Sequence, residues 1–465
     1  MEKMLKQDLT PALALCGLLL AAPAAAQDAP AAPPRLEVPY AQFTLPNGLT
    51  VIVHEDHSVP LVSVNAWYHV GSGREKTGRT GFAHLFEHLM FEGSAHVKEG
   101  EFDTLLEGAG GNNNGSTNSD RTNYWIDVPS NAVDLALFLE SDRMGWLLEV
   151  MSPERVDGQR DVVKNERRQG VENAPYGTAG IVLDEMLYPE GHPYHWPTIG
   201  YMEDLTAASY EDVVDFFRRY YPPNNASLVL AGDIDVARAK AFVEKWFGEI
   251  KPRDTVPPLE FPQAILTGVQ KRTLTDRVQL PRLYLAWLTP AHFRPGDAAL
   301  DMVSQVLAGG KNSRLYKRLV YDLQIAQDVA AFQASAALSS SYQIIVTPRL
   351  DRRDGKSVTP QAAIEDVQRI VDEELEKLRN EPPSAREMER ALNQVEASFY
   401  DSMEAVGGFG GKADRLNAYF FATGDPDYFN EDLARYRALS ANDIQAAVRR
   451  FLPQDRRVEL TVLPQ

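Results

Sequence analysis

Cysteine is almost absent from this chain, and its absence excludes two kinds of structure. The sequence has 465 residues and one cysteine, Cys16, close to the N-terminus. One thiol can form neither a disulfide framework nor a zinc site of paired thiolates. The protein is therefore not a disulfide-stabilised scaffold and not a thiolate zinc protein.

Positive charge is scarce relative to negative charge. Lys and Arg together number 47, Asp and Glu number 65, and the formal net charge is −18. Binding to a nucleic-acid backbone requires clustered cations. This balance excludes nucleic acid as an expected partner.

Long hydrophobic runs are absent after the first residues, so we expect no membrane span in the mature chain. Residues 1–26 have the features of a signal peptide. Lys3 and Lys6 supply positive charge, residues 11–23 are apolar, and an A-x-A cleavage sequence ends at Ala26. Cleavage there predicts a periplasmic or secreted protein, with the bacterial periplasm as the first expectation.

Two other interpretations of the N-terminus are weaker. A retained anchor is disfavoured because the apolar stretch is too short to span a bilayer comfortably. Lipid attachment at Cys16 is disfavoured because the large Leu15 precedes it and apolar residues continue beyond it.

A proline-rich segment, 251–262, divides the chain into nearly equal parts. We interpret 27–36 as a flexible leader, 37–250 as an N-terminal domain, 251–262 as a linker and 263–465 as a C-terminal domain. A chain of this length favours two or more domains over a single core.

The two parts end alike. Leu205–Leu230 is predicted to form a helix that begins near Ser209, then a proline, then an apolar strand. Leu439–Leu463 repeats this order, with a helix that begins near Ser440. Because the match falls at the ends of two equal halves, it predicts a duplicated unit.

Apolar periodicity predicts interleaved strands and helices in both halves. The fold class expected is α+β, with two homologous α/β-sandwich domains that each pack helices on a mixed or antiparallel sheet. The predicted strands are 42–54 (with a turn at 46–48), 61–70, 282–288 and 342–346. The predicted helices are 81–91, 99–108, 132–148, 153–172, 235–247, 297–307, 359–379 and 385–402.

One predicted helix carries the residues of a metal site, His84-Leu-Phe-Glu-His88. Residues four apart on a helix lie one turn above each other, so both imidazoles can bind one zinc ion. Glu87 lies beside them, where a carboxylate can take a proton from water and pass it to a leaving amine. This motif is the inverse of H-E-x-x-H.

A helix with two ordinary histidines and a salt-bridging Glu87 is the structural alternative. Two observations oppose it: the helix is otherwise apolar, and a catalytic zinc site needs a third ligand for which downstream carboxylates exist. Glu166 is the residue that we favour. Composition alone does not separate it from the other acidic residues of the predicted helix, Asp161, Glu154 and Glu172.

Several motifs together resemble the pitrilysin (insulinase-like) family of zinc peptidases. They are His84-Leu-Phe-Glu-His88, Met90-Phe-Glu-Gly93, Val163-Lys-Asn-Glu166, Gly71-Ser-Gly-Arg-Glu75, Gly110-Gly-Asn-Asn-Asn-Gly-Ser-Thr117, Asn173-Ala-Pro-Tyr-Gly177 and His192-Pro-Tyr-His-Trp-Pro-Thr-Ile-Gly200. The resemblance covers nearly the whole mature chain.

The resemblance implies a role for several residues. His84, His88 and Glu166 match the ligands of one zinc ion, and Glu87 matches the general base. The sequence Asn114-Gly115-Ser116-Thr117 matches an edge strand that pairs with the substrate backbone. A plain turn is the alternative for the asparagine cluster. For His192 and His195 we prefer a polar loop to a ligand role.

The sequence departs from the family pattern in two places. Gln159 stands where relatives often have a further Glu, and an amide cannot relay a proton. Val320 and Gln327 stand where complete members have an Arg and a Tyr. Arg318 and Tyr321 are too close together to replace that pair. The chain is therefore expected to be the zinc-bearing subunit of a heterodimer whose sister subunit supplies the pair.

The function predicted from the sequence is a zinc metalloendopeptidase that hydrolyses peptides or unfolded segments. The alternative from another class is a non-catalytic scaffold or binding subunit. The intact set of His84, Glu87, His88 and Glu166 favours the enzyme. Specialised processing of one precursor and general peptide clearance remain equally compatible with the sequence.

Overall fold

The computed structural model describes residues 35–465. The predicted signal peptide and most of the predicted leader lie outside the described residues. Within the described residues, Glu37–Gln465 form one compact unit. Everything below concerns this compact unit.

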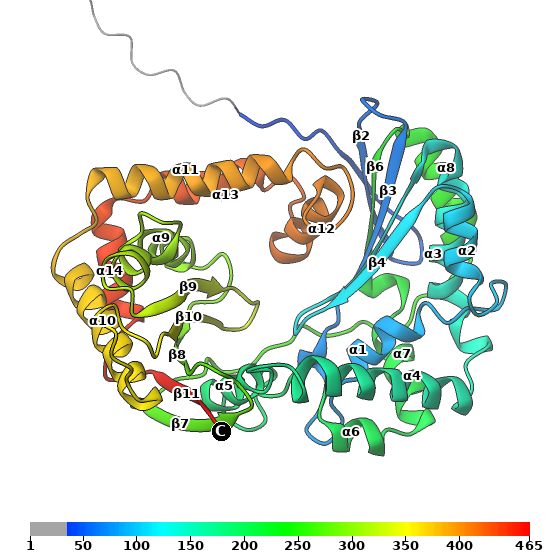
Figure 1. The fold of residues 1–465 in the computed structure, drawn as a ribbon. Helices are drawn as coiled ribbons and strands as arrows, with labels where there is room; N and C mark the ends of the chain where they lie inside the picture. The colour runs from blue at the N-terminus through cyan, green and yellow to red at the C-terminus, as the bar shows by residue number, and fades with distance from the viewer. Residues whose placement is uncertain (1–34) are drawn as a thin grey trace, which may run out of the picture. The chain divides into compact units, whose positions relative to one another are not determined.

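The first half contains a six-stranded mixed sheet (Figure 1). Its spatial order is β1-β2-β6-β3-β5-β4, so β4 is an edge strand. The strands are β1 (Ala41–Thr44), β2 (Thr50–Glu55), β3 (Leu61–Tyr68), β4 (Asn112–Thr117), β5 (Thr122–Pro129) and β6 (Ala226–Gly232).

The predicted turn at 46–48 is present, but it divides the predicted strand 42–54 into two strands. The turn at 46–48 folds this segment into the antiparallel hairpin β1–β2, and the carbonyl of Leu45 accepts a hydrogen bond from Gly48 N. Gly48 has φ +87°, which glycine adopts without steric cost. The next strand, β3, does not pair with β2, because β6 lies between them.

The second half contains a five-stranded sheet of the same connectivity, ordered β7-β11-β8-β10-β9. Its strands are β7 (Gln270–Asp276), β8 (Arg282–Thr289), β9 (Ala326–Ala334), β10 (Ser340–Pro348) and β11 (Val458–Pro464). Both β6 and β11 enter their sheets last, parallel to one neighbour and antiparallel to the other. The predicted duplication is therefore present in the fold.

Helices pack against both sheets. In the first half they are α1 (Phe82–Leu89), α2 (Glu101–Gly108), α3 (Val133–Trp146), α4 (Pro153–Arg167), α5 (Ala179–Leu187), α6 (Met202–Ala207), α7 (Tyr210–Tyr220) and α8 (Val236–Phe247). In the second half they are α9 (Asp297–Ala308), α10 (Pro360–Asn380), α11 (Ala385–Ser402), α12 (Lys412–Thr423), α13 (Phe429–Arg437) and α14 (Ala441–Phe451). A five-residue π-helix, Arg168–Glu172, continues α4. Among the described residues no helix is long and apolar enough to cross a membrane.

The paired ends of the two halves begin their helices in the same way. Ser209 and Asp212 form a capping box at α7, and Ser440 and Asp443 form one at α14. Each box satisfies backbone N–H groups of the first turn that have no partner within the helix. The predicted helix starts near Ser209 and Ser440 are confirmed.

Each half also places a helix against the other half's sheet. Apolar residues of α5, such as Leu183 and Leu187, share a buried cluster with Tyr284 and Leu460 of the second sheet. In return α12 lies against β3 and β6 through polar contacts, including Asn417 Nδ2 to the Asn65 carbonyl at 3.0 Å (Figure 1). The halves are therefore joined by an exchange of helices.

Candidate metal centre

The site begins with the way in which α1 starts. The helix follows Gly81, whose φ is +91° and whose Cα lies so close to Gly200 that a side chain on Gly200 would clash with it. The buried Glu75 carboxylate accepts hydrogen bonds from Gly81 N and Ala83 N, both at 2.8 Å. Burial raises the pKa of Glu75 to about 8, and these hydrogen bonds oppose that rise. Gly71–Glu75 and the segment before Gly200 thus position the helix.

The sequence of α1 separates an apolar face from a polar one. Phe82, Leu85, Phe86 and Leu89 are buried in the core of the first half. His84, Glu87 and His88 are only partly buried. The spacing of the apolar residues therefore fixes which way the polar side chains point.

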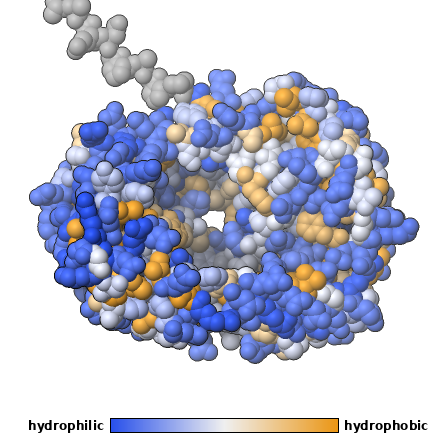
Figure 2. All heavy atoms as spheres, viewed as in Figure 1, coloured by the Kyte–Doolittle hydropathy of each residue, from blue (hydrophilic) through white to orange (hydrophobic). Residues whose placement is uncertain are grey.

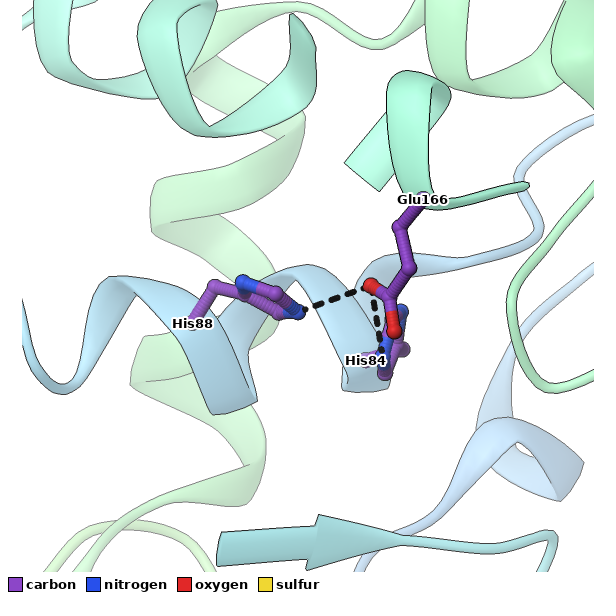
Figure 3. A group of neighbouring side chains, drawn as sticks. All are labelled: His84, His88 and Glu166. Atoms are coloured by element: carbon purple, nitrogen blue, oxygen red, sulfur yellow. Dashed lines mark ion pairs between the residues drawn. The ribbon is translucent and has the colours of Figure 1, made fainter. Parts of the chain in front are cut away.

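His84, His88 and Glu166 lie together (Figure 3). Glu166 reaches from α4, and its Oε2 is 3.3 Å from His88 Nε2 and 3.7 Å from His84 Nε2. Among the residues that the structure describes, this is the group of His, Cys, Asp and Glu placed to hold a metal ion. The other acidic candidates are not in it: Asp161 pairs with Lys164, Glu172 pairs with Arg167, and Glu154 lies at the start of α4.

The donor set and its spacing fit zinc. Two imidazoles and one carboxylate with an open fourth position form a known catalytic zinc set. Zinc–ligand bonds of about 2.0–2.1 Å imply tetrahedral donor separations of roughly 3.4 Å. The two nitrogen–oxygen distances, 3.3 and 3.7 Å, lie on either side of this value.

Burial favours the neutral, ligating form of His84. Its side chain is 13% exposed, and its Nδ1 is buried without a hydrogen-bond partner among the described residues. Burial, and secondarily the charge of His88, lowers the pKa of His84 to about 4. His88 and Glu166 are more open, at 25% and 49% exposure, so solvent reaches the site from their side.

Glu87 lies between α1 and the edge strand β4. Burial raises the pKa of its carboxyl, while a hydrogen bond donated by the Thr117 hydroxyl and the nearby His88 and Arg121 oppose the rise. Gly115 packs directly on it, since a Cβ there would lie 3.2 Å from Glu87 Cγ. The carboxylate is thus positioned beside both the metal group and β4.

The free edge of β4 runs past Glu87. Asn118 N donates to the Arg121 carbonyl across the turn between β4 and β5. Because hydrogen-bonded pairs alternate in an antiparallel ladder, the backbone groups of Asn113, Gly115 and Thr117 face away from β5. In the view of Figures 1 and 2, the surface beside β4 is hollowed.

The four predicted substrate-binding residues lie on this strand but differ in orientation. Gly115 and Thr117 lie on the α1 side, beside Glu87. Ser116 is on the opposite face and donates to Asn123 Oδ1. Asn114 Oδ1 accepts a hydrogen bond from Gly115 N, which is one of the backbone donors on the free edge of β4. The alternative of a plain turn is wrong, because residues 112–117 form a paired strand.

Arg121 is a feature that the sequence analysis missed. Its guanidinium donates to the Ser116 carbonyl at 2.8 Å and to Ser116 Oγ at 2.7 Å, and so fixes the end of β4. It is also close enough to Glu87 to favour the ionised carboxylate. Only the fold shows this, because an isolated arginine in a turn has no distinguishing pattern.

The structure shows the contacts of the residues at which the sequence departs from the family pattern. The Gln159 amide bonds Glu92, next to the metal group. Val320 packs against the core of the second half, and Gln327 is exposed on β9. Arg318 is occupied by ion pairs with Glu373 and Glu374, and Tyr321 is 71% exposed.

The remaining histidines do not belong to the metal group. His192 lies in a loop, as expected, but its ring is buried and stacks on Tyr188 with centroids 4.6 Å apart. His195 Nδ1 bonds the Tyr188 carbonyl. These two histidines hold the segment before Gly200.

Family models match both halves of the chain. The model described as insulinase (peptidase family M16) matches residues 50–185, and the model described as the peptidase M16 inactive domain matches residues 207–395. The chain belongs to the M16 peptidase family. His84, Glu87, His88 and Glu166 all fall within the insulinase match.

Two curated relatives have names that agree with this membership. Zinc protease PqqE of Helicobacter pylori is 29% identical over 366 residues, which are 78% of this chain and 80% of the relative. An uncharacterized zinc protease of Mycobacterium leprae is 30% identical over 64% of this chain and 67% of the relative.

Solved structures share the two-domain fold. A protease from Helicobacter pylori, 25% identical, superimposes with a TM-score of 0.83 over 92% of this chain and 100% of that chain. The first half of the periplasmic protease PqqL from Escherichia coli, 16% identical, gives a TM-score of 0.70 over 91% of this chain and 92% of that chain. The predicted α+β fold of two homologous domains is confirmed.

Proposed function

We propose that this protein is a zinc metalloendopeptidase that cleaves peptides or unfolded segments. The single observation that carries the proposal is the convergence of His84, His88 and Glu166 next to Glu87. Ligands from two separate helices meet at donor distances suited to one small cation. The names of the relatives as zinc proteases support the same activity.

Each residue has a distinct role in this proposal. His84, His88 and Glu166 hold the zinc ion, which supplies Lewis-acid activation of water and of the scissile carbonyl. The Glu87 carboxylate takes a proton from water and delivers it to the leaving nitrogen. Thr117 and Arg121 hold that carboxylate oriented and ionised.

The substrate binds as an added strand on β4. The outward backbone groups of Asn113, Gly115 and Thr117 give an extended peptide its hydrogen bonds. Asn114 releases Gly115 N as the peptide arrives, and Ser116 fixes the strand from behind. Because Gly115 lies on Glu87, the bond paired near Gly115 is the one presented for cleavage.

A sister subunit completes the enzyme in this proposal. Val320 and Gln327 supply neither a guanidinium nor a phenol, and Arg318 is held by two glutamates. Loss of an oxyanion donor typically costs about a hundred- to a thousandfold in rate. The isolated chain is therefore expected to turn over slowly until a partner brings an Arg and a Tyr.

The place of action proposed is the periplasm or the exterior, after cleavage at Ala26. The signal sequence carries this part, and the periplasmic PqqL of Escherichia coli shares the fold. Fusion of residues 1–26 to a reporter active only after export tests it.

The decisive experiment compares Glu87→Gln with wild type on an unstructured quenched-fluorescence peptide, alongside metal analysis. We expect one zinc per chain in both proteins and a rate about a hundred- to ten-thousandfold lower in the variant. Glu172→Gln is the matched control, because this carboxylate pairs with Arg167 outside the metal group. Chelation should abolish cleavage and zinc should restore it.

A scaffold or binding subunit gives the opposite result. It predicts no cleavage by the wild-type chain, alone or with a partner, and therefore nothing for Glu87→Gln to remove. Absence of zinc from the purified chain would contradict the proposal directly.

A further inference from the structure

A glycine-rich loop of the second half, Val406–Gly411, lies on the first sheet. It joins α11 to α12 and reaches the face of the sheet opposite α1 (Figure 1). A Cβ on Gly407 would lie 2.0 Å from Asp127 Oδ1, so only glycine permits this contact with β5. The ring of Phe409 meets Trp125 edge-on, with centroids 5.8 Å apart.

A single carboxylate anchors this loop. Asp414 Oδ2 accepts from Gly410 N at 2.9 Å. Its Oδ1 accepts from three side chains of the first sheet: Asn123 Nδ2 at 2.8 Å, Trp67 Nε1 at 2.9 Å and Asn65 Nδ2 at 3.3 Å. The loop is therefore held in one position, and its aromatic residue is presented on a fixed support.

Phe409 remains exposed despite this anchoring. Its exposed fraction is 48%, in a segment whose other residues are mostly glycine. An aromatic ring left uncovered on an anchored loop indicates a surface that an apolar group of a ligand can cover.

The position of this surface relative to β4 identifies that ligand. Trp125 of β5 pairs with Asn114 of β4. The next residue of β4, Gly115, packs on Glu87. Successive strand residues are about 3.3 Å apart and their side chains alternate between faces. A peptide added to β4 would therefore direct alternate side chains toward Phe409, within roughly one or two residues of the cleaved bond.

We propose that Phe409 and Trp125 form a subsite for a large apolar side chain of the peptide substrate. Such a side chain would cover Phe409 and lose its own contact with water, whereas a charged one would be desolvated without a partner. The second half would thus determine specificity at a metal site that it does not carry. This inference rests on strand addition at β4, as in the proposed function.

The test uses a peptide cleaved at one bond, in which each nearby position is Leu, Ala or Asp in turn. Wild type should prefer Leu over Ala about tenfold and over Asp still more at one position. Phe409→Ala should reduce the Leu-to-Ala preference there to about twofold, and Phe409→Leu should retain most of it. Ile265→Ala is the control, because Ile265 is 75% exposed in the segment before β7.

Two outcomes would overturn the inference. One is an unchanged Leu-to-Ala ratio at every position in Phe409→Ala. The other is an equal loss for all peptides while zinc content and thermal stability match wild type, because that loss would not depend on the side chain.

A binding measurement separates this inference from the catalytic proposal. Labelled Leu and Ala peptides are titrated into Glu87→Gln, with and without Phe409→Ala. If wild type cleaves nothing but Leu-selective binding depends on Phe409, the subsite stands and the catalytic proposal fails. If neither peptide binds selectively, the subsite is refuted.

Discussion

The helix that carries His84 and His88 has a counterpart in the second half that carries no histidine. α1 follows β3 and α9 follows β8, the equivalent strand of the second sheet, and both helices start after a left-handed glycine, Gly81 (φ +91°) and Gly296 (φ +107°). Counted from these glycines, His84, Glu87 and His88 correspond to Ala299, Met302 and Val303, all buried. The same backbone thus serves as a site in one half and as core in the other.

The two helices that pack on the opposite sheet, α5 and α12, differ in the chemistry of their contacts. α5 presents Leu183 and Leu187 to the second sheet, an apolar contact suited to holding the halves together. α12 presents Asp414 and Asn417 to the first sheet, where polar side chains meet in hydrogen bonds. Apolar side chains thus join α5 to the second sheet, whereas α12 adds a network of hydrogen bonds to the first sheet.

The sharpest test of this comparison removes a matched residue from each helix. His88→Ala should lose zinc and reduce cleavage about a thousandfold or more, because Lewis-acid activation is worth several kcal/mol. Val303→Ala should keep zinc and cost only about 1–3 kcal/mol of stability, by deleting buried methyl groups. Metal analysis, peptide cleavage and urea unfolding measure both.

The comparison fails if Val303→Ala also loses zinc while still folded. In that case α9 would also influence the metal site, and the proposed difference in role between α1 and α9 would be wrong.

A smaller effect is expected at the edge strands. Gly115→Ala would place a methyl group 3.1 Å from Tyr124 and 3.2 Å from Glu87, which displaces the carboxylate. We expect kcat/KM to fall about tenfold, because small misplacements of a catalytic group are costly. Ala330→Ser on the exposed face of β9 should leave it unchanged. Equal rates for Gly115→Ala and wild type would show that β4 tolerates movement.

The smallest effect concerns how α4 and its counterpart α11 begin. The third residue of α4 is Arg155, whereas that of α11 is Glu387, which bonds Ser384 and pairs with Arg314 at 2.7 Å. Burial alone would raise the pKa of Glu387, but these partners lower it to about 2.

The stabilisation from Glu387 is complete above the unfolded pKa of 4.5 and is lost as the pH falls toward 2. Glu387→Gln should therefore lower the free energy of unfolding by about 1–2 kcal/mol at pH 7, and by much less at pH 2.5. Urea midpoints at the two pH values measure the difference. A penalty independent of pH would show that the carboxylate charge contributes nothing.

Sequence reasoning worked where the information is local. The spacing of His84 and His88 predicts a shared face because one helix carries both, and Ser209 and Ser440 mark helix starts through bonds within one turn. Glu166 needed the family resemblance, since periodicity cannot tell which carboxylate of α4 faces α1. The turn at 46–48 was predicted, but the insertion of β6 between β2 and β3 was not, because alternation alone does not show which strand pairs with which.

The contacts between the halves could not be predicted in the same way. Asp414 meets Trp67 and Asn123 across a long stretch of chain, and no pattern near any of them indicates the others. The sequence places His192 in a loop but does not show that its ring is buried against Tyr188. Long-range packing decides these roles, so they become visible only in three dimensions.

The exchange of α5 and α12 has a consequence for dissecting the chain. A cut in the linker 251–262 would not release two self-sufficient proteins, because each fragment would lack the helix that covers one face of its sheet. The fragments should instead find each other and re-form the fold when produced together. The peptide connection at 251–262 is therefore not what holds the two halves together. The packing of α5 and α12 on the opposite sheets does this.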